Sequence, residues 1–463
     1  MARRQGGTLG GFTPLSTPNA PTGLSVSTSI GSASVSFTAP TDTGDGAVTS
    51  YIVTAIDEST GASTGATGSA SPITVSPGGG TFKIRAQAVN GFGPGRLTEF
   101  DTGNEIYSGA GLYAWGSGGS GRLGDDTTVS KSSPIQVGAL TSWSQVSSGS
   151  GHTASVKTDG TLWTWGAASD GKLGHDDSIF RSSPVQVGAL TNWSQASAST
   201  AITACVKTDG TLWTWGDGQQ GKLGHNNTIS LSSPVQVGAL TDWAQVSASD
   251  GGACVKTDGT LWTWGRNTWG QLGHNDIAYL SSPTQVGALT NWAQVSTSSN
   301  NTACVTTAGT LFTWGINNNG QLGQDDTVNR SSPVQVGALT NWSQVAFGAN
   351  HCAAITTAGT LFTWGYNGSG RLGDDTVVAK SSPVQVGALT DWSQVACSEA
   401  HCAVVKTDGT LWGWGNNGSG GLGDGTTISK SSPIQVGALT SWTQVSANGG
   451  GGDYQTFALL GVV

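Results

Sequence analysis

The sequence predicts an all-β protein: a seven-bladed β-propeller closed by its C-terminal strand and preceded by a small β-sandwich. A segment QVGAL begins at residues 136, 186, 236, 285, 335, 385 and 435, and a segment LxxWG recurs in step with it. Copies of a unit about fifty residues long indicate one repeated supersecondary unit. The 72 glycines and the lack of apolar residues at helical spacing favour strands joined by tight turns.

Residues 1–19, which begin MARRQGGTLGGF, are expected to form an extended arm. They contain no apolar core of a secretory signal, so we expect synthesis in the cytoplasm without export. A Gly-rich terminus is often a free tail. The alternative is an anchor on a neighbouring subunit, for which Arg3, Arg4 and Phe12 are the candidate contacts.

Residues 20–103 lack the repeated motifs and contain runs such as SYIVTAI and TFKIRAQAV, which are bounded by Gly, Pro, Asp and Ser. Such alternating runs predict strands. Pro21 with Leu24, Tyr51 and the run AVNGFG at 88–93 resemble a fibronectin type III domain, an immunoglobulin-like β-sandwich. Phe37 and Phe82 stand where that family has a core Trp and a Tyr. The resemblance implies a spacer or docking module, followed by a linker at 104–111.

Within one repeat, four strand-like segments alternate with turn residues. They are SWSQVSS (142–148), HTASVKT (152–158), TLWTWG (161–166) and PVQVG (184–188), and Asp159-Gly160 is a hairpin turn between the second and third. Four strands in each repeat predict a propeller blade.

The two ends of the repeat array predict how the ring closes. The first LxxWG, at 112–116, lacks the strand that precedes every other copy, and the chain ends with one additional segment, YQTFALLG (454–461). That last segment is in the frame of HTASVKTDG, so we expect it to complete the first blade. A propeller over residues 112–463 then has no open sheet edge.

The order GxxHTxxVKTDGTLWTWGxxxxGKLG followed by SSPVQVGALTxWSQVS resembles the regulator of chromosome condensation repeat family, from about residue 107 to 463. The resemblance implies a seven-bladed propeller closed by strand exchange. It implies no single activity, because relatives include a guanine nucleotide exchange factor, inhibitors and scaffolds. The motif His is present as His152, His351 and His401, whereas Ile202 and Asn301 replace it in other copies. No repeat is long enough to hold the exchange factor's insertion, so exchange activity is not expected.

The sequence predicts no catalytic, cofactor-binding or metal-ligating residue, and no cofactor. GAASDGKL (166–173) and GDGQQGKL (216–223) resemble P-loops but lack the Ser or Thr after Lys. The paired Asp residues of the same loops are expected to cap their own backbone rather than to bind calcium. The three His residues have no paired nucleophile or carboxylate and are expected to make structural hydrogen bonds.

The six cysteines are expected to be reduced. Cys205, Cys254 and Cys304 share one repeat position, Cys352 and Cys402 share another, and Cys397 stands alone. Copies of one position lie in separate blades, where a buried thiol acts as a small hydrophobic group. Most of the 19 Trp residues also recur at fixed positions, as core packing between blades requires.

Strand order assigns the DG turns and GALT connectors to one face, and the xGxxH loops and long WGxxxxG…SSP loops to the other. The first face is nearly uniform, and the second carries most differences between blades. The candidate partner contacts are the large residues expected in these variable loops: Phe180, Arg266, Trp269, Tyr279, Ile316, Phe347 and Tyr366. Drift between copies, or packing within the loops, is an equally weighted explanation.

A net charge of -9 without a basic stripe argues against nucleic-acid binding, and the absence of long apolar runs argues against membrane insertion. The domain texture favours a non-enzymatic virion structural protein of a bacteriophage, such as a decoration, fibre or tail-associated protein. The N-terminal region would bind capsid or tail proteins. The propeller would then be presented to a host surface protein or glycan for host attachment. Self-association of the chain is a further option. The alternatives are a surface adhesin or carbohydrate-binding protein, and a regulatory propeller of the exchange factor or inhibitor type.

Overall fold

The computed structural model describes residues 16–29, 31–58, 61–78, 80–106, 111–138, 140–448 and 454–461. The chain divides into two compact units, Met1–Gly109 and Ala110–Val463. Each unit is all-β. The candidate anchors Arg3, Arg4 and Phe12 lie outside the described residues.

The first unit is a sandwich of two antiparallel sheets, one with the strand order β1-β2-β5 and one with the order β4-β3-β6-β7. The strands are β1 (Thr22–Ser29), β2 (Ser32–Thr38), β3 (Ser50–Asp57), β4 (Ser63–Gly68), β5 (Ile73–Val75), β6 (Gly80–Asn90) and β7 (Gly93–Ile106). β7 extends into the expected linker, and Asn19 of the expected arm donates its backbone N–H to Asp42 O at 3.0 Å. The sandwich therefore takes residues from both neighbouring segments.

Alternate residues of β2, β3 and β6 face one core between these two sheets. Val35, Val53 and Ile84 are fully buried in it, and the rings of Phe37 and Tyr51 lie 4.8 Å apart. Burial on one face of each strand is what the alternating sequence requires. The predicted immunoglobulin-like sandwich is confirmed, whereas its assignment to the fibronectin type III family stays a prediction.

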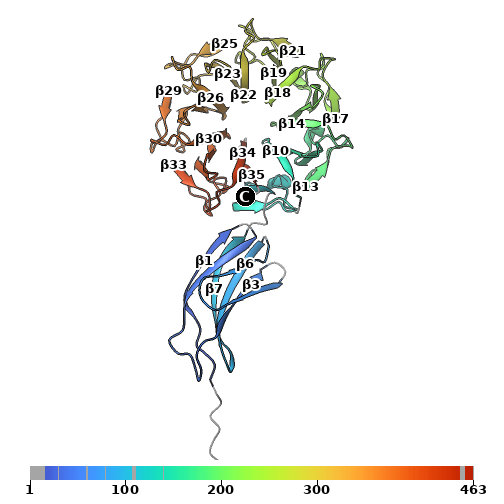
Figure 1. Ribbon diagram of the computed structural model, residues 1–463. Helices are drawn as coiled ribbons and strands as arrows, with labels where there is room; N and C mark the ends of the chain where they lie inside the picture. The colour runs from blue at the N-terminus through green and yellow to red at the C-terminus, as the bar shows by residue number, and fades with distance from the viewer. Residues whose placement is uncertain are drawn as a thin grey trace, which may run out of the picture. The chain divides into compact units, whose positions relative to one another are not determined.

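The second unit is a seven-bladed propeller, and each blade is a four-stranded antiparallel sheet (Figure 1). The innermost strands are β10 (Trp143–Ser148), β14 (Trp193–Ala198), β18 (Trp243–Ala248), β22 (Trp292–Thr297), β26 (Trp342–Phe347), β30 (Trp392–Cys397) and β34 (Trp442–Asn448). The second strands are β11 (His152–Lys157), β15 (Ile202–Lys207), β19 (Gly251–Lys256), β23 (Asn301–Thr306), β27 (His351–Thr356), β31 (His401–Lys406) and β35 (Gln455–Leu460).

The third strands are β8 (Gly111–Gly116), β12 (Leu162–Gly166), β16 (Leu212–Gly216), β20 (Leu261–Gly265), β24 (Leu311–Gly315), β28 (Leu361–Gly365) and β32 (Leu411–Gly415). The outermost strands are β9 (Lys131–Gln136), β13 (Arg181–Gln186), β17 (Leu231–Gln236), β21 (Leu280–Gln285), β25 (Arg330–Gln335), β29 (Lys380–Gln385) and β33 (Lys430–Gln435). Short 3-10 turns, η1 (Gly119–Gly121), η2 (Ser169–Gly171) and η3 (Gln219–Gly221), interrupt three of the long loops. We number the blades 1 (β10–β13) to 6 (β30–β33) in chain order and name the last sheet the closing blade.

The closing blade joins the two ends of the array, as the sequence predicted. Its strand order is β34-β35-β8-β9, so the C-terminal strand β35 lies between β34 and the first strand of the ring. Phe457 of β35 pairs with Ala114 of β8 and is fully buried. Every blade therefore has two neighbours, and the ring has no open end.

A ring of seven tryptophans fastens each blade to the one before it, with the closing blade included. Each of these side chains is at most 1 % exposed, and its indole Nε1 donates to a backbone carbonyl in the preceding blade at 2.9–3.0 Å. The seven are Trp115, Trp165, Trp215, Trp264, Trp314, Trp364 and Trp414. The recurring Trp of the LxxWG segment thus packs between blades, as expected, and satisfies its own buried donor.

A second ring of contacts is formed by the glutamines of the innermost strands. Gln294 Oε1 accepts from the backbone N–H of Val345 at 2.8 Å and its Nε2 donates to the carbonyl of the same residue at 2.9 Å. Gln145 makes the same pair of bonds with Ala196 of blade 2. These side chains stand in for a strand partner, because the innermost edge of each blade has no further strand beside it.

The turns lie on the two faces that strand order assigned to them. Trp193 at the end of a GALT connector donates its N–H to Gly160 O of a DG turn at 3.0 Å. On the other face, Ala167 of a long loop donates to Gly151 O of an xGxxH loop at 2.7 Å. We name the second face, with its two loops from every blade, the long-loop face.

Candidate protein-binding face

The structure places the seven predicted contact residues in different environments on the long-loop face. Phe180, Tyr279 and Tyr366 are 56 %, 47 % and 40 % exposed. Arg266, Trp269 and Ile316 are half-buried. Blade 1 supplies Phe180, and the consecutive blades 3, 4 and 5 supply the other five residues. The role of all six in binding stays a prediction.

Phe347 does not lie in an exposed loop, and the sequence analysis was wrong on this point. It is the last residue of the innermost strand β26, is 5 % exposed, and packs in a core cluster with Val345, Cys352 and Trp364. Side chains two residues apart in a strand point to the same side of the sheet. Phe347 lies two residues after the buried Val345, so both side chains point into the core. A bulky residue at this position fills space between blades 4 and 5.

The variable residues of blade 3 are partly held by one another. Arg266 Nη1 lies 2.8 Å from Asp250 Oδ2, and its Nε donates to Thr268 Oγ1 at 3.0 Å. The hydroxyl of Tyr279 lies 3.0 Å from the same Thr268 oxygen. Arg266 and Tyr279 are therefore oriented in advance, which lowers the entropy lost when a partner binds them.

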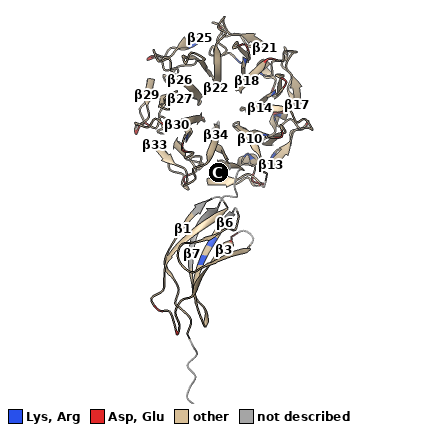
Figure 2. Cartoon of the chain, viewed as in Figure 1, with Lys and Arg blue, Asp and Glu red and all other residues tan. Residues whose placement is uncertain are grey.

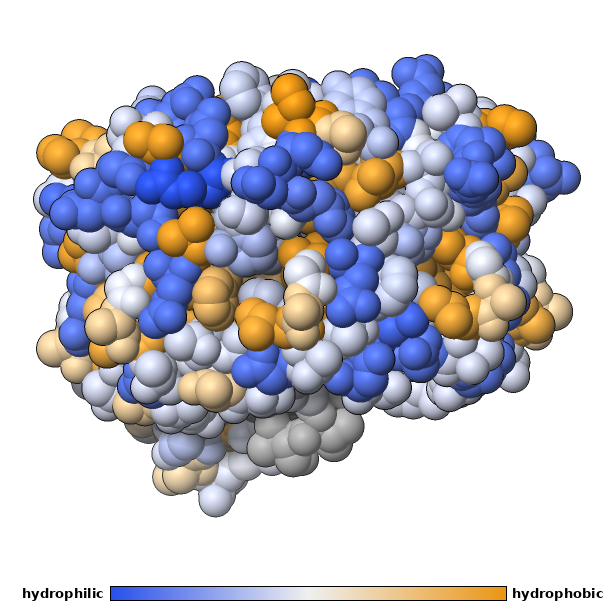
Figure 3. Space-filling view, turned by 90° about the horizontal axis from the view of Figure 1, so that it is seen from above, coloured by the Kyte–Doolittle hydropathy of each residue, from blue (hydrophilic) through white to orange (hydrophobic). Residues whose placement is uncertain are grey.

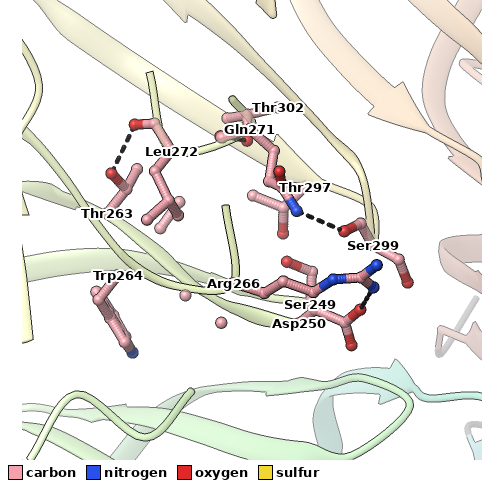
Figure 4. A pocket seen from close by; sticks show the side chains of 13 residues that line it. Ser249, Asp250, Thr263, Trp264, Arg266, Gln271, Leu272, Thr297, Ser299 and Thr302 are labelled. Carbon is pink, nitrogen blue, oxygen red and sulfur yellow. Dashed lines mark hydrogen bonds and ion pairs between the residues drawn. The ribbon is translucent and has the colours of Figure 1, made fainter. Parts of the chain in front are cut away.

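A small cavity lies beneath these residues, lined by Asp250, Arg266, Gln271 and Trp264 (Figure 4). It measures about 10 Å³, roughly the room that one water molecule needs. Gly251 and Gly252 line it where blade 1 has His152 and Thr153, and the ring of Trp264 packs directly against Gly252. The cavity is too small for a substrate.

An apolar ring that the sequence analysis missed surrounds the long-loop face. Each blade carries at least one exposed Val or Ile just before its outermost strand, and blade 5 carries two, Val377 and Val378. One residue from each blade makes up the set Val129, Ile179, Ile229, Ile277, Val328, Val378 and Ile428, which are 58–66 % exposed. We name this set the apolar ring. Figure 3, a view at right angles to Figure 1, shows hydrophobic side chains in separate patches among hydrophilic ones.

The apolar ring escaped attention because it is repeated. Six of these seven residues occupy one repeat position, two residues before the outermost strand, so differences between blades do not reveal them. The signal in the sequence is a Val or Ile that recurs near the end of every long loop, shortly before the SSP segment. Apolar residues exposed singly are ordinary on protein surfaces, so it is their recurrence on every blade that makes the apolar ring a candidate contact surface.

The mouth of the central cavity opens on the same face. This cavity of about 590 Å³ is lined mostly by small hydroxyl and amide side chains, such as Ser199, Ser298 and Asn300. Among the lining residues that the structure describes, Glu399 is the one carboxylate. Ser398, one of the lining residues, has its Oγ 2.6 Å from His401 Nδ1, but burial lowers the pKa of His401 to about 3, so this imidazole is a poor general base.

The motif histidines make the structural hydrogen bonds that were expected. His152 Nε2 lies 2.8 Å from Thr203 Oγ1 of blade 2, and His401 Nε2 lies 2.7 Å from Thr456 Oγ1 of the closing blade. All three motif histidines are fully buried. Burial lowers the pKa of His401 from 6.5 to about 3, and lowers the pKa of His152 well below its ordinary value. These imidazole rings are therefore uncharged and pack between adjacent blades.

The P-loop-like and acidic loops also serve the structure. Lys172 Nζ donates to the carbonyl of Thr200 in the next blade at 3.0 Å. Asp125 and Asp177 accept backbone N–H groups two residues ahead, at 3.2 and 3.0 Å. The expected capping is confirmed. Lys172 thus contacts a neighbouring blade, whereas Lys222 pairs with Asp217 of its own loop at 2.6 Å.

The expectation of six reduced thiols needs correction. Cys205, Cys254, Cys304 and Cys352 are free and buried as expected, but Cys397 and Cys402 form a disulfide. These two residues face each other on β30 and β31, across a short loop. Equivalent positions lie in different blades and cannot pair, whereas Cys397 and Cys402 lie on adjacent strands of one blade.

Charged residues are thinly scattered over the described part of the propeller and form no basic stripe (Figure 2). In the described residues, no helix is long and apolar enough to cross a membrane. The long-loop face is therefore sparsely charged and partly apolar, with exposed aromatic groups on blades 1, 3 and 5.

Comparisons with known proteins agree with this geometry. The model of the regulator of chromosome condensation (RCC1) repeat matches residues 110–156, 159–206, 209–255, 258–305, 308–355, 358–405 and 408–459. No curated protein sequence matches the chain. Among solved structures, human WBSCR16 is 22 % identical with a TM-score of 0.69, over 76 % of this chain and 99 % of that one. Prp20p from Saccharomyces cerevisiae is 18 % identical with a TM-score of 0.68, over 77 % of this chain and 92 % of that one.

The Prp20p structure is described together with its binding to Gsp1p and histones, and a further structure contains yeast Prp20 bound by Kap60. At these identities the likeness shows a shared fold, and the repeat match covers all seven blades. The chain therefore belongs to the regulator of chromosome condensation (RCC1) repeat family.

Proposed function

We propose that this protein is a non-enzymatic binding propeller of the regulatory type, which holds a protein partner on its long-loop face. The observation that carries the proposal is the apolar ring, because every blade presents a Val or Ile that is more than half exposed at the same edge. A partner that covers several of these groups removes apolar surface from water. Burial of one such side chain contributes about 1.5–3 kcal/mol.

Blade 3 supplies a second kind of contact. Its Arg266 and Tyr279 are held by Asp250 and Thr268, next to the half-buried Trp269. Arg, Tyr and Trp are the residues that most often dominate binding energy in protein interfaces. The apolar ring would then supply area, and blade 3 would determine which partner is accepted.

Relatives of the same fold lend support, since Prp20p is described as binding Gsp1p and histones, and Kap60 binds Prp20. The supporting feature is that these are protein partners. The identity of the partner here is not carried over from them, because the likeness is below 25 % identity.

The test compares two triple variants of the full chain. One replaces Ile179, Ile229 and Val328 of the apolar ring by Thr, which keeps the branched shape and adds a hydroxyl. The matched control replaces Leu240, Leu289 and Leu339 by Thr, since these are 44–46 % exposed at the GALT connectors of the opposite face. Partners are captured by crosslinking in the source cells, purified, and titrated against each variant by calorimetry.

We expect the apolar-ring variant to bind at least roughly tenfold more weakly than the control, because about 1.4 kcal/mol corresponds to a factor of ten. Equal binding by both variants would contradict the proposal. Weaker binding by the control alone would place the partner on the opposite face. Glycan binding on an array, without any protein partner, would instead favour the adhesin alternative.

The virion role remains a separate proposal that rests on the texture of the sequence. It predicts that the chain is present at a fixed copy number in purified particles, with capsid or tail proteins as the partners of its N-terminal unit. Absence from purified particles would remove this proposal and leave the binding propeller untouched.

A further inference from the structure

One buried cluster lies outside the proposed binding face and has no assigned role. Among the described residues, one set of three His, Cys, Asp or Glu side chains lies close together: His351, Cys397 and Cys402, whose donor atoms are all within 4.8 Å of one another. His351 comes from blade 5, and the two cysteines come from blade 6. Their exposed fractions are 0 %, 7 % and 0 %.

The cluster replaces an ordinary contact between blades. At the other two motif histidines, Nε2 contacts a Thr hydroxyl in the next blade, whereas His351 Nε2 lies 3.2 Å from Cys402 Sγ. The residue opposite Cys402 on the innermost strand is Cys397, where most other blades have Ala, Ser or Thr. The interface between blades 5 and 6 thus gathers two sulfurs and an imidazole at one point.

His351 also lacks a group that His401 has. Ser398 Oγ lies 2.6 Å from His401 Nδ1, but Gly348 stands at the matching position beside His351, and His351 Nδ1 has no hydrogen-bond partner in the described part of the chain. Within the same described residues His152 Nδ1 is likewise without a partner, so the feature that sets His351 apart is the sulfur of Cys402 beside its Nε2.

The cluster can be reached from solvent through the central cavity. Cys397 lines the cavity of about 590 Å³ that opens on the long-loop face, together with Phe347 and Glu399. An ion could enter by this route, and a water molecule could occupy a remaining coordination position. Cys402 and His351 lie behind Cys397, away from the cavity lining.

We propose that Cys397, Cys402 and His351, once the disulfide is reduced, form a binding site for one soft metal ion such as Zn²⁺. Two thiolates and an imidazole are ligands that zinc prefers, and three protein ligands leave the fourth tetrahedral position open toward the cavity. The disulfide is the oxidised form of the same ligand pair, so the site binds metal in the reduced state alone.

The chemistry balances with a dithiol as the reductant. The dithiol gives two electrons and two protons to the Cys397–Cys402 bond, which breaks into two thiols, and the reductant leaves as its own disulfide. Metal binding then displaces the two thiol protons into solvent. The proposal is independent of the protein-binding role.

The test uses the full-length protein, reduced with a dithiol, freed of reductant without oxygen, and titrated with Co²⁺ as an optical probe. We expect a single equivalent of Co²⁺ to give a thiolate-to-cobalt charge-transfer band, and Zn²⁺ to remove it. The oxidised protein should give no band.

Two variants use residues that the repeat already tolerates at these positions. Cys402→Thr restores the His–Thr contact of the other blades, and Cys397→Ala matches Ala198 and Ala248. Both should fold, which circular dichroism checks, and both should lose the band. The matched control Cys352→Thr removes a buried thiol that faces Phe347 instead of a second thiol, and should keep the band.

A reduced wild-type protein that gives no band would overturn the proposal, as would a band that survives in both Cys402→Thr and Cys397→Ala. A band lost equally in Cys352→Thr would show that cobalt binds scattered thiols, and would overturn it as well. Loss of the charge-transfer band in His351→Gln, with folding intact, would complete the assignment, and an unchanged band would remove His351 from the site.

Discussion

Replacement of His401 by Gln should make the propeller more resistant to mild acid. His401 is fully buried between blade 6 and the closing blade, with Nε2 at 2.7 Å from Thr456 Oγ1. Gln is the residue that the repeat itself uses there, because Gln455 pairs with Gly116 in the closing blade as His401 pairs with Gly415 in blade 6. The variant therefore keeps a polar side chain of a type that already fits the position.

The expected magnitude follows from the pKa of His401, which burial lowers from 6.5 to about 3. The unfolded chain binds this proton more readily than the folded one, so the contribution to stability is complete above pH 6.5 and falls as the pH decreases toward 3. The loss is about 1.4 kcal/mol for each pH unit in this window, or about 3 kcal/mol at about pH 4.5. Burial lowers the pKa of His152 and His351 in the same direction.

The assay is urea unfolding of the wild type and the variant at several pH values between about 7.5 and 4.5, followed by Trp fluorescence. This range stays above the ordinary Asp pKa of 3.8, below which protonation of the capping carboxylates would add to the loss of stability. The free energy of unfolding should fall less steeply with decreasing pH in the variant, by up to about 3 kcal/mol at the acid end. If the free energy of unfolding fell equally steeply with decreasing pH in both proteins, His401 would not be the uncharged, buried group that this prediction assumes.

Three further substitutions test the scaffold by urea unfolding. Gly160→Ala should lower the free energy of unfolding more than Gly188→Ala. Both glycines have positive φ, but a Cβ added at Gly160 meets the carbonyl of the GALT connector, whereas a Cβ at Gly188 faces open space. Equal losses in the two variants would contradict the close contact at Gly160. Phe457→Ala should lower stability by about 3–5 kcal/mol, because it empties a fully buried site on the closing strand, and a loss below about 1 kcal/mol would argue against the closure. Gln294→Ala should lower the free energy of unfolding by about 1–3 kcal/mol, because it leaves a backbone N–H and a carbonyl of the next blade without partners. No loss of stability would mean that water molecules replace the two hydrogen bonds of Gln294.

The sequence alone determined the architecture of the propeller. A strict period, an additional segment at the C-terminus and a missing strand at the start of the array leave one way to complete every blade, and the pairing of β35 with β8 follows it. Local chemistry was equally readable, since Asp159-Gly160 specifies a turn and Asp125 caps its own loop. These features depend on residues close together in the chain, or on the copy number of the repeat.

The tertiary structure decided which side chains meet between blades and which remain exposed. Phe347 is buried, and Cys397 forms a disulfide with Cys402. The Nε2 of His351 contacts the sulfur of Cys402, whereas the Nε2 of His152 contacts a Thr hydroxyl. These contacts join residues on different strands or about one repeat apart, so they depend on register and on the depth of each strand within the blade. The exposed Val and Ile of the apolar ring were visible in the sequence, but only burial in the folded ring separates them from the equally apolar residues of the core.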